Sequence, residues 1–182
     1  RRVGDADHEQ ARGVVGHGIL DRRGLRHQAL AAGADAETLE FVLDDLPDRL
    51  SRADLDSALA RLDRQRLTRV EADTTIAIVG RVADASYEVR FAADTDLSER
   101  SLWPAAPHEE HGVEDARFVR FTDDDGTGTY VATYTGYDGS RVSLCRLQTD
   151  DFVTFRSSPM TGRAATDKGL ALFPRTVGGR HL

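Results

Sequence analysis

The sequence predicts a mainly β protein with an N-terminal helical segment, and the β part is predicted to belong to a β-propeller of antiparallel four-stranded blades. Three observations lead to this fold class. Apolar residues first repeat with a helical period and then, beyond residue 72, alternate with a period of two. Four strands in succession, joined by tight turns, are typical of one propeller blade. A charged pair that opens an apolar strand occurs at Asp115 and returns about 50 residues later at Asp167.

The N-terminal part, residues 1–72, is predicted to be a loop followed by a helical hairpin. Residues 1–30 are rich in Arg, Gly and His and have no clear period, so we expect a loop or the remnant of a strand. From Asp35 a helix is expected that ends at Pro47. Ser51 and Asp54 have the spacing of a capping box and predict a second helix to about Gln65. The apolar faces of the two helices are Leu39, Val42, Leu43 and Leu46 in the first and Leu55, Leu59 and Leu62 in the second.

The C-terminal part, residues 73–182, is predicted to be about two blades of a partial propeller. Ile76 and Ile78 alternate in a first expected strand, and residues 87–91 form the next. A loop from Asp94 to His111 precedes four strands near residues 117–122, 129–136, 141–148 and 152–157, which are separated by Asp- and Gly-rich turns. Lys168 then opens the next blade. The chain lacks an initial Met and ends at an expected strand start, so we expect a fragment truncated at both ends.

Composition excludes several classes of function. The net charge of −7 and the pI of about 5.3 argue against a nucleic-acid surface, which needs clustered Lys and Arg. No run approaches the roughly 18 apolar residues of a membrane helix, so we expect no membrane association. Cys145 is the only cysteine, which excludes an internal disulfide and a cysteine-rich metal site. A reducing cytoplasm is the expected compartment.

The strongest candidate site lies in the segment Gly112–Phe121, where Glu114, Asp115 and Arg117 open an apolar strand. Charged groups at a strand start are aimed at one rim of a sheet, where an acid catalyst and its anion-binding partner could sit. On the residues alone, a turn with solvated acids beside an arginine is the simpler interpretation. Neighbouring strand residues point to opposite faces, so Glu114 and Asp115 can serve one substrate only if the backbone turns there. Asp115 is expected to share its side with Arg117.

Three segments in order resemble glycoside hydrolase family 130, the β-mannoside phosphorylases and related inverting mannosidases. They are Gly112-Val113-Glu114-Asp115-Ala116-Arg117, then Thr133-Tyr134-Thr135-Gly136-Tyr137-Asp138, and then Lys168-Gly169-Leu170-Ala171-Leu172-Phe173-Pro174 with Gly178-Gly179-Arg180. The resemblance covers about residues 87–182. It implies a five-bladed β-propeller and an enzyme that cleaves or phosphorolyses β-mannosides by single displacement with inversion.

The resemblance also implies roles for individual residues. Asp115 matches the aspartate that protonates the leaving glycosidic oxygen, and Arg117 matches the arginine that orients the sugar and the acid. Lys168 matches the basic residue that helps to hold the attacking phosphate. Glu114, Tyr137 and Asp138 fall in the matching motifs and are expected to bind substrate. Inorganic phosphate is the co-substrate of a phosphorylase, and no cofactor or metal is expected.

This sequence departs from the family at several points. Ala116 stands where the family usually has Pro, which puts the stiffness of that turn in doubt. The family takes further phosphate-binding Arg, Lys and His residues from later blades, and those positions lie beyond this chain. Phosphorolysis and hydrolysis therefore both stay open, and the isolated 182-residue chain is expected to be inactive. Open blades expose strand edges, so a homo-oligomer is possible.

Alternatives stay open beside this hypothesis. The chain could be a non-catalytic carbohydrate-binding or scaffold propeller, because fold alone does not give function. Trp103 and Tyr137 could pack in the core or form a sugar subsite, whereas packing is expected for Tyr134 and Cys145. The acidic run at residues 123–126 is expected to be a hairpin turn and not a calcium loop. The run His108-Glu109-Glu110-His111 is expected to be a polar loop and not a metal site.

Overall fold

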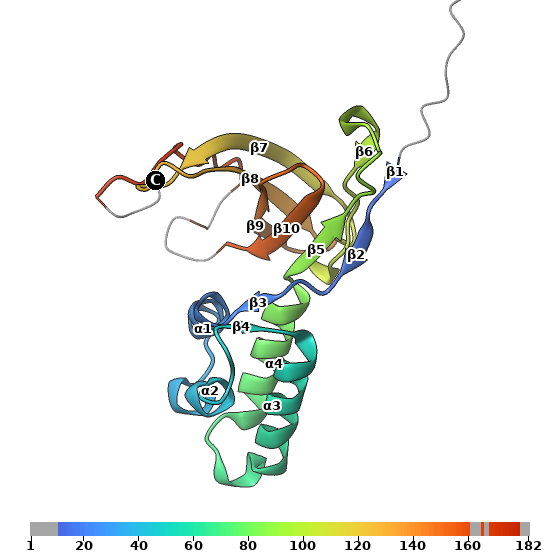
Figure 1. Cartoon of the computed structure of the whole chain (residues 1–182). Coiled ribbons are helices and arrows are strands. Elements are labelled where there is room, and N and C mark those ends of the chain that lie inside the picture. Colours follow the sequence, from blue (N-terminus) through green and yellow to red (C-terminus); the bar gives the residue numbers. More distant parts are fainter. Residues whose placement is uncertain (1–10, 161–164, 166–167, 179–182) are drawn as a thin grey trace, which may run out of the picture.

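Four helices and a six-stranded antiparallel sheet make up the part of the chain that the structure describes, residues 11–160, 165 and 168–178 of a computed structural model (Figure 1). The helices gather at one end of the molecule, and the last of them leads into the sheet. They are α1 (Arg22–Ala31), α2 (Ala36–Leu43), α3 (Arg52–Arg64) and α4 (Ala72–Asp84), with 3₁₀ turns η1 (Arg66–Thr68), η2 (Leu97–Glu99) and η3 (Pro107–Glu109).

The large sheet has the strand order β2-β5-β10-β9-β8-β7, and all neighbouring strands are antiparallel. Its strands are β2 (Val14–Gly16), β5 (Tyr87–Arg90), β7 (Val113–Thr122), β8 (Gly128–Tyr137), β9 (Val142–Thr149) and β10 (Thr154–Pro159). Two short pairs accompany it: β1 (Ala11–Arg12) with β6 (Arg100–Ser101), and β3 (Leu20–Asp21) with β4 (Arg49–Leu50). The four strands expected after residue 111 are confirmed, as is the strand that begins at Tyr87.

The two predicted helices are confirmed, and their caps explain where they start. Asp35 precedes α2, and its carboxylate accepts a hydrogen bond from the Thr38 amide at 2.9 Å. Ser51 precedes α3 in a full capping box, because the Asp54 amide donates to the Ser51 hydroxyl and the Ser51 amide donates to the Asp54 carboxylate. These bonds satisfy amide donors that a helix cannot pair internally.

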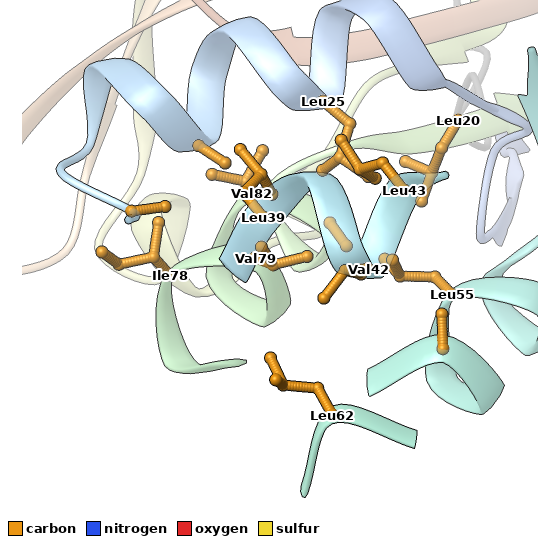
Figure 2. Packing of buried hydrophobic residues seen from close by; sticks show 14 of the residues in the cluster. Leu20, Leu25, Leu39, Val42, Leu43, Leu55, Leu62, Ile78, Val79 and Val82 are labelled. Atoms are coloured by element: carbon orange, nitrogen blue, oxygen red, sulfur yellow. The ribbon is translucent and has the colours of Figure 1, made fainter. Parts of the chain in front are cut away.

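The helices share one apolar core, seen from close by in Figure 2. Leu39 of α2, Leu55 and Leu62 of α3 and Val79 of α4 are each fully buried in it. Burying one such side chain contributes about 1.5–3 kcal/mol. Within the described residues, no helix is long and apolar enough to cross a lipid bilayer.

Two elements of the helical part differ from the prediction. Residues 72–84 form helix α4, so the strand expected at Ile76 and Ile78 is wrong. The buried residues of α4 follow a helical spacing, and this packing outweighs the strand preference of β-branched side chains. They are Ala72, Thr75, Ile78, Val79, Val82 and Ala83. Helix α1 lies in the segment expected to be loop, because Asp21 caps it and Leu25 and Ala29 are buried between charged neighbours.

Gly80 gives a direct test of the α4 assignment. It lies inside the helix, and a Cβ added there meets no atom within 4 Å. Alanine loses less backbone entropy than glycine on entering a helix. We therefore expect Gly80→Ala to raise the free energy of unfolding by about 0.5–1 kcal/mol, measured by urea denaturation. An unchanged or lower stability would contradict the helix at this position.

The predicted partial β-propeller is wrong. The fold combines helices with one open sheet, and no four-stranded blade ends at β10, because β10 pairs with β9 on one side and with β5 on the other. β2, from the N-terminal segment, then extends the same sheet beyond β5. The sequence pattern defines where strands occur but not which strands pair, and these pairings are distant in sequence.

The segment expected to open a second blade forms no strand in its described part, residues 168–178. It lies against β7 and β8 instead: the Thr122 amide donates to the Pro174 carbonyl at 2.9 Å, and the Thr133 hydroxyl donates to the Leu170 carbonyl. A single bridge joins Thr122 to Arg175. The motif at Lys168 therefore contacts the motif at Asp115, although the two do not occupy equivalent places in successive blades. Asp167 lies outside the described residues.

Candidate functional site

The start of β7 is interrupted by a β-bulge. The register with β8 shifts between Glu114 and Arg117, and Asp115 has a φ of 60°. A non-glycine residue at positive φ is uncommon, although Asp tolerates this conformation better than most. Bulges redirect side chains and often lie beside functional sites. The backbone thus turns at the point where a turn is needed for Glu114 and Asp115 to serve one site.

Glu114 and Asp115 line the same hollow, which has a volume of about 300 Å³. Trp103, Tyr87 and Tyr134 also line it, so carboxylates and aromatic rings face one space. Ligand sites in proteins are typically concave, with apolar walls and a few polar groups. The hollow is therefore large enough for a small polar ligand such as one sugar ring.

Lys168 reaches this site from the C-terminal segment. Its ammonium lies 2.6 Å from a carboxylate oxygen of Glu114, and both side chains are about half exposed. The hydrogen bond to Glu114 and the charge of Glu114 raise the pKa of Lys168, and the charge of Asp115 acts in the same direction. Two motifs that are distant in sequence thus place an ammonium beside two carboxylates.

Arg117 does not form an ion pair with Asp115, although the two were expected to lie on the same side of the strand. The bulge changes the alternation of side chains along β7, and the Arg117 guanidinium donates to the carbonyl of Gly169. Gly169 has a φ of 76°, and a Cβ there would lie 3.3 Å from the guanidinium. Arg117 therefore holds the residue that follows Lys168 against β7. Asp115 forms no ion pair with any residue that the structure describes.

Tyr137 and Asp138 lie at the end of β8. Tyr137 is 39% exposed, and its hydroxyl donates to the Gly139 carbonyl at 2.7 Å. The Asp138 carboxylate accepts from the amides of Ser140 and Arg141, which lowers its pKa. Asp138 therefore stabilises the β8–β9 turn, and only Tyr137 of this pair offers a surface to a ligand.

Trp103 is 46% exposed in the loop that leads to β7. The guanidinium of Arg12 lies over its ring, 4.2 Å from the centroid. Because the ring lines the hollow beside Asp115, it is available to a ligand and is not sealed in the core. Tyr134 and Cys145, in contrast, are buried, which confirms the packing expected for both.

A buried carboxylate lies directly behind the site, where a polar loop was expected. Glu109 is fully buried. Its carboxylate accepts hydrogen bonds from the hydroxyls of Tyr87 and Tyr134 and from the Ala105 amide. Nothing in the local sequence distinguishes Glu109 from Glu110, which is exposed. The distinction depends on hydroxyls supplied by β5 and β8, which sequence spacing does not reveal.

Burial controls the protonation of the groups around Glu109. It lowers the pKa of His108, although the charges of Glu109 and Asp138 oppose this effect. It raises the pKa of the Cys145 thiol to about 12. Burial also raises the pKa of the Tyr87 and Tyr134 hydroxyls, which remain donors at neutral pH.

Comparison with known proteins adds nothing to this geometry. No protein-family model, curated protein or solved structure matches the chain. The chemistry available to the site follows from its own groups. An exposed carboxylic acid can give or take a proton, an ammonium can hold an anion, and an exposed indole can stack against the C–H face of a sugar.

Proposed function

We propose that this chain supplies the proton donor and part of the anion site of an enzyme resembling glycoside hydrolase family 130, which cleaves or phosphorolyses β-mannosides by single displacement with inversion. The observation that carries the proposal is the meeting of Lys168 with Glu114 and Asp115 at the bulge of β7. These three groups can act together at the bulge without a propeller fold. The strained backbone at Asp115 agrees with it, because such strain gathers at functional sites.

Asp115 protonates the leaving glycosidic oxygen, while phosphate or water attacks the sugar from the opposite face. With phosphate, the anion takes the place of Glu114 as the counter-ion of Lys168, and Glu114 turns to the sugar hydroxyls. Phosphate is already a nucleophile and needs cations more than a base. With water, a second carboxylate is needed at about 6.5–9.5 Å from the acid. Arg117 positions the Lys168 segment, and Trp103 and Tyr137 offer aromatic surface to the sugar.

The direct test is incubation of the full-length protein with β-1,4-mannobiose, with and without phosphate. We expect mannose 1-phosphate when phosphate is present, or free mannose in both cases if the enzyme is a hydrolase. The 182-residue chain alone is expected to be inactive, because among the described residues Lys168 is the only cation that we assign to the phosphate site. Failure of the full-length protein to cleave the substrate under either condition would reject the proposal.

A second candidate is carbohydrate binding without catalysis, and the exposure of Trp103 beside the hollow favours it. Stacking of a sugar on an indole needs no acid. Binding that depends on Trp103, in a protein with no turnover, would support this alternative.

The proposed compartment is the reducing cytoplasm, because the single cysteine is a buried thiol that forms no disulfide. We also propose that copies of the chain can associate through an edge of the sheet. β7 is a ten-residue edge strand, most of its residues are exposed, and residues 168–178 cover part of its edge near Thr122. Unpaired edges of this length favour pairing with another chain.

A further inference from the structure

Three different metal-ligating side chains meet behind the candidate site. His108 and Glu109 come from η3, and Cys145 comes from the middle of β9. One ligand atom from each residue lies within 4.8 Å of the others. The Cys145 sulfur is 3.2 Å from His108 Nε2, and this nitrogen is 3.6 Å from Glu109 Oε1.

Two of these three separations are close to the edges of a small coordination polyhedron, and the third lies within 4.8 Å. Tetrahedral zinc has bonds of about 2.0–2.3 Å, which places its ligand atoms about 3.3–3.8 Å apart. The two measured edges lie close to this range before any metal has drawn the ligands together. Imidazole nitrogen, thiolate sulfur and carboxylate oxygen are also the donor set that zinc prefers.

Hydrogen bonds from the backbone already hold the Glu109 carboxylate in one orientation, as is needed for a metal ligand. Its second oxygen, Oε2, accepts hydrogen bonds from the amides of Ala105 and Ala106 at 2.8 and 3.3 Å. These bonds fix the carboxylate with Oε1 facing His108, and Oε1 also accepts hydrogen bonds from the Tyr87 and Tyr134 hydroxyls. Hydrogen bonds of this kind orient the ligands of known metal sites.

A fourth position and an approach are both present. The Tyr134 hydroxyl contacts Glu109 Oε1 and lies 2.6 Å from the Ser157 hydroxyl. The His108 side chain is 14% exposed, so an ion or a water molecule can reach the cluster at this residue. Catalytic zinc sites typically have three protein ligands and one such open position.

We propose that His108, Glu109 and Cys145 form a zinc(II) site whose fourth ligand is water or the Tyr134 hydroxyl. The Cys145 S–H bond is replaced by an S–Zn bond, and one proton is released to solvent for each ion bound. A positive ion here also compensates the carboxylate buried at Glu109. This site is independent of the glycosidase proposal, since neither the acid at Asp115 nor the cation at Lys168 takes part.

The test is titration of the full chain, first stripped with a chelator, with Zn²⁺ and then with Co²⁺. We expect one ion per chain and, with Co²⁺, the charge-transfer band of a thiolate–cobalt bond. Cys145→Ser should abolish that band, and His108→Gln should weaken Zn²⁺ binding by at least about 10–100-fold. Circular dichroism should show that both variants remain folded.

His111→Gln is the matched control, because it removes an imidazole from the same loop outside the cluster. It should bind Zn²⁺ as the unaltered chain does. Equal Zn²⁺ affinity in the unaltered chain, Cys145→Ser and His108→Gln, or a cobalt complex without the thiolate band, would overturn the proposal. The buried cluster would then be a hydrogen-bonded core without a metal.

Discussion

In the proposed enzyme, replacement of Asp115 by Asn should lower the kcat for β-1,4-mannobiose by about 10²–10⁴-fold, because the amide keeps the shape of the side chain but cannot donate an acidic proton. Binding of the substrate should change little, so KM stays within a few-fold. The measurement is steady-state kinetics on the full-length protein with the preferred nucleophile, phosphate or water. An Asp115→Asn enzyme that turns over normally would remove Asp115 from the role of acid.

Two controls separate loss of the acid from damage to the site. A mannoside with an activated aryl leaving group needs no protonation, so Asp115→Asn should retain most of its activity on that substrate. Glu114→Gln alters the adjacent side chain, which lines the same hollow and pairs with Lys168. It should change KM for sugar or phosphate more than kcat. Glu114→Gln could instead lower kcat on mannobiose and retain activity on the aryl mannoside, as expected of Asp115→Asn. Glu114, and not Asp115, would then be the acid.

The sequence identified the charged groups of this candidate site better than it predicted their geometry. Glu114, Asp115 and Lys168 could be singled out because charged residues open two apolar segments, and the structure brings them together. From the sequence alone, we could say only that Glu114 and Asp115 serve one substrate if the backbone turns there. The bulge itself could not be predicted, since backbone angles depend on pairing with β8. Asp138 accepts hydrogen bonds within a turn, and Arg117 donates to the Gly169 carbonyl. Residue spacing does not encode these contacts, so the sequence could not predict them.

The sequence likewise predicted some elements of the fold and missed others. Local signals predicted α2 and α3, because Asp35, Ser51 and Asp54 mark helix starts by their own hydrogen bonds. Alternation predicted the strands β7 to β10. Alternation failed at α4, where β-branched residues suit either structure and tertiary packing decides. It could not predict that β10 pairs with β5, and this pairing makes one sheet in place of separate blades.

Removal of the Glu109 carboxylate should destabilise the protein more than any surface change in the same loop. Glu109→Ala leaves the Tyr87 and Tyr134 hydroxyls and the Ala105 amide without their acceptor in a buried space. Unsatisfied buried groups cost about 1–3 kcal/mol each, although a hydroxyl can turn to another partner. We expect the free energy of unfolding to fall by about 3–5 kcal/mol, the sum for about two such groups left unsatisfied, measured by urea denaturation.

Two further variants show whether hydrogen bonding to the carboxylate causes the loss. Glu109→Gln keeps an oxygen for the Ala105 and Ala106 amides, and its NH₂ group can donate to the tyrosine hydroxyls, so it should cost less than Glu109→Ala. Glu110→Ala, one residue along and exposed, should stay within about 0.5 kcal/mol of the unaltered chain. A Glu109→Ala protein as stable as Glu110→Ala would mean that the loop before β7 is held by other contacts. Because this loop leads into the bulge, the Glu109→Ala protein should also lose the placement of Asp115, and activity should fall even where the chain remains folded.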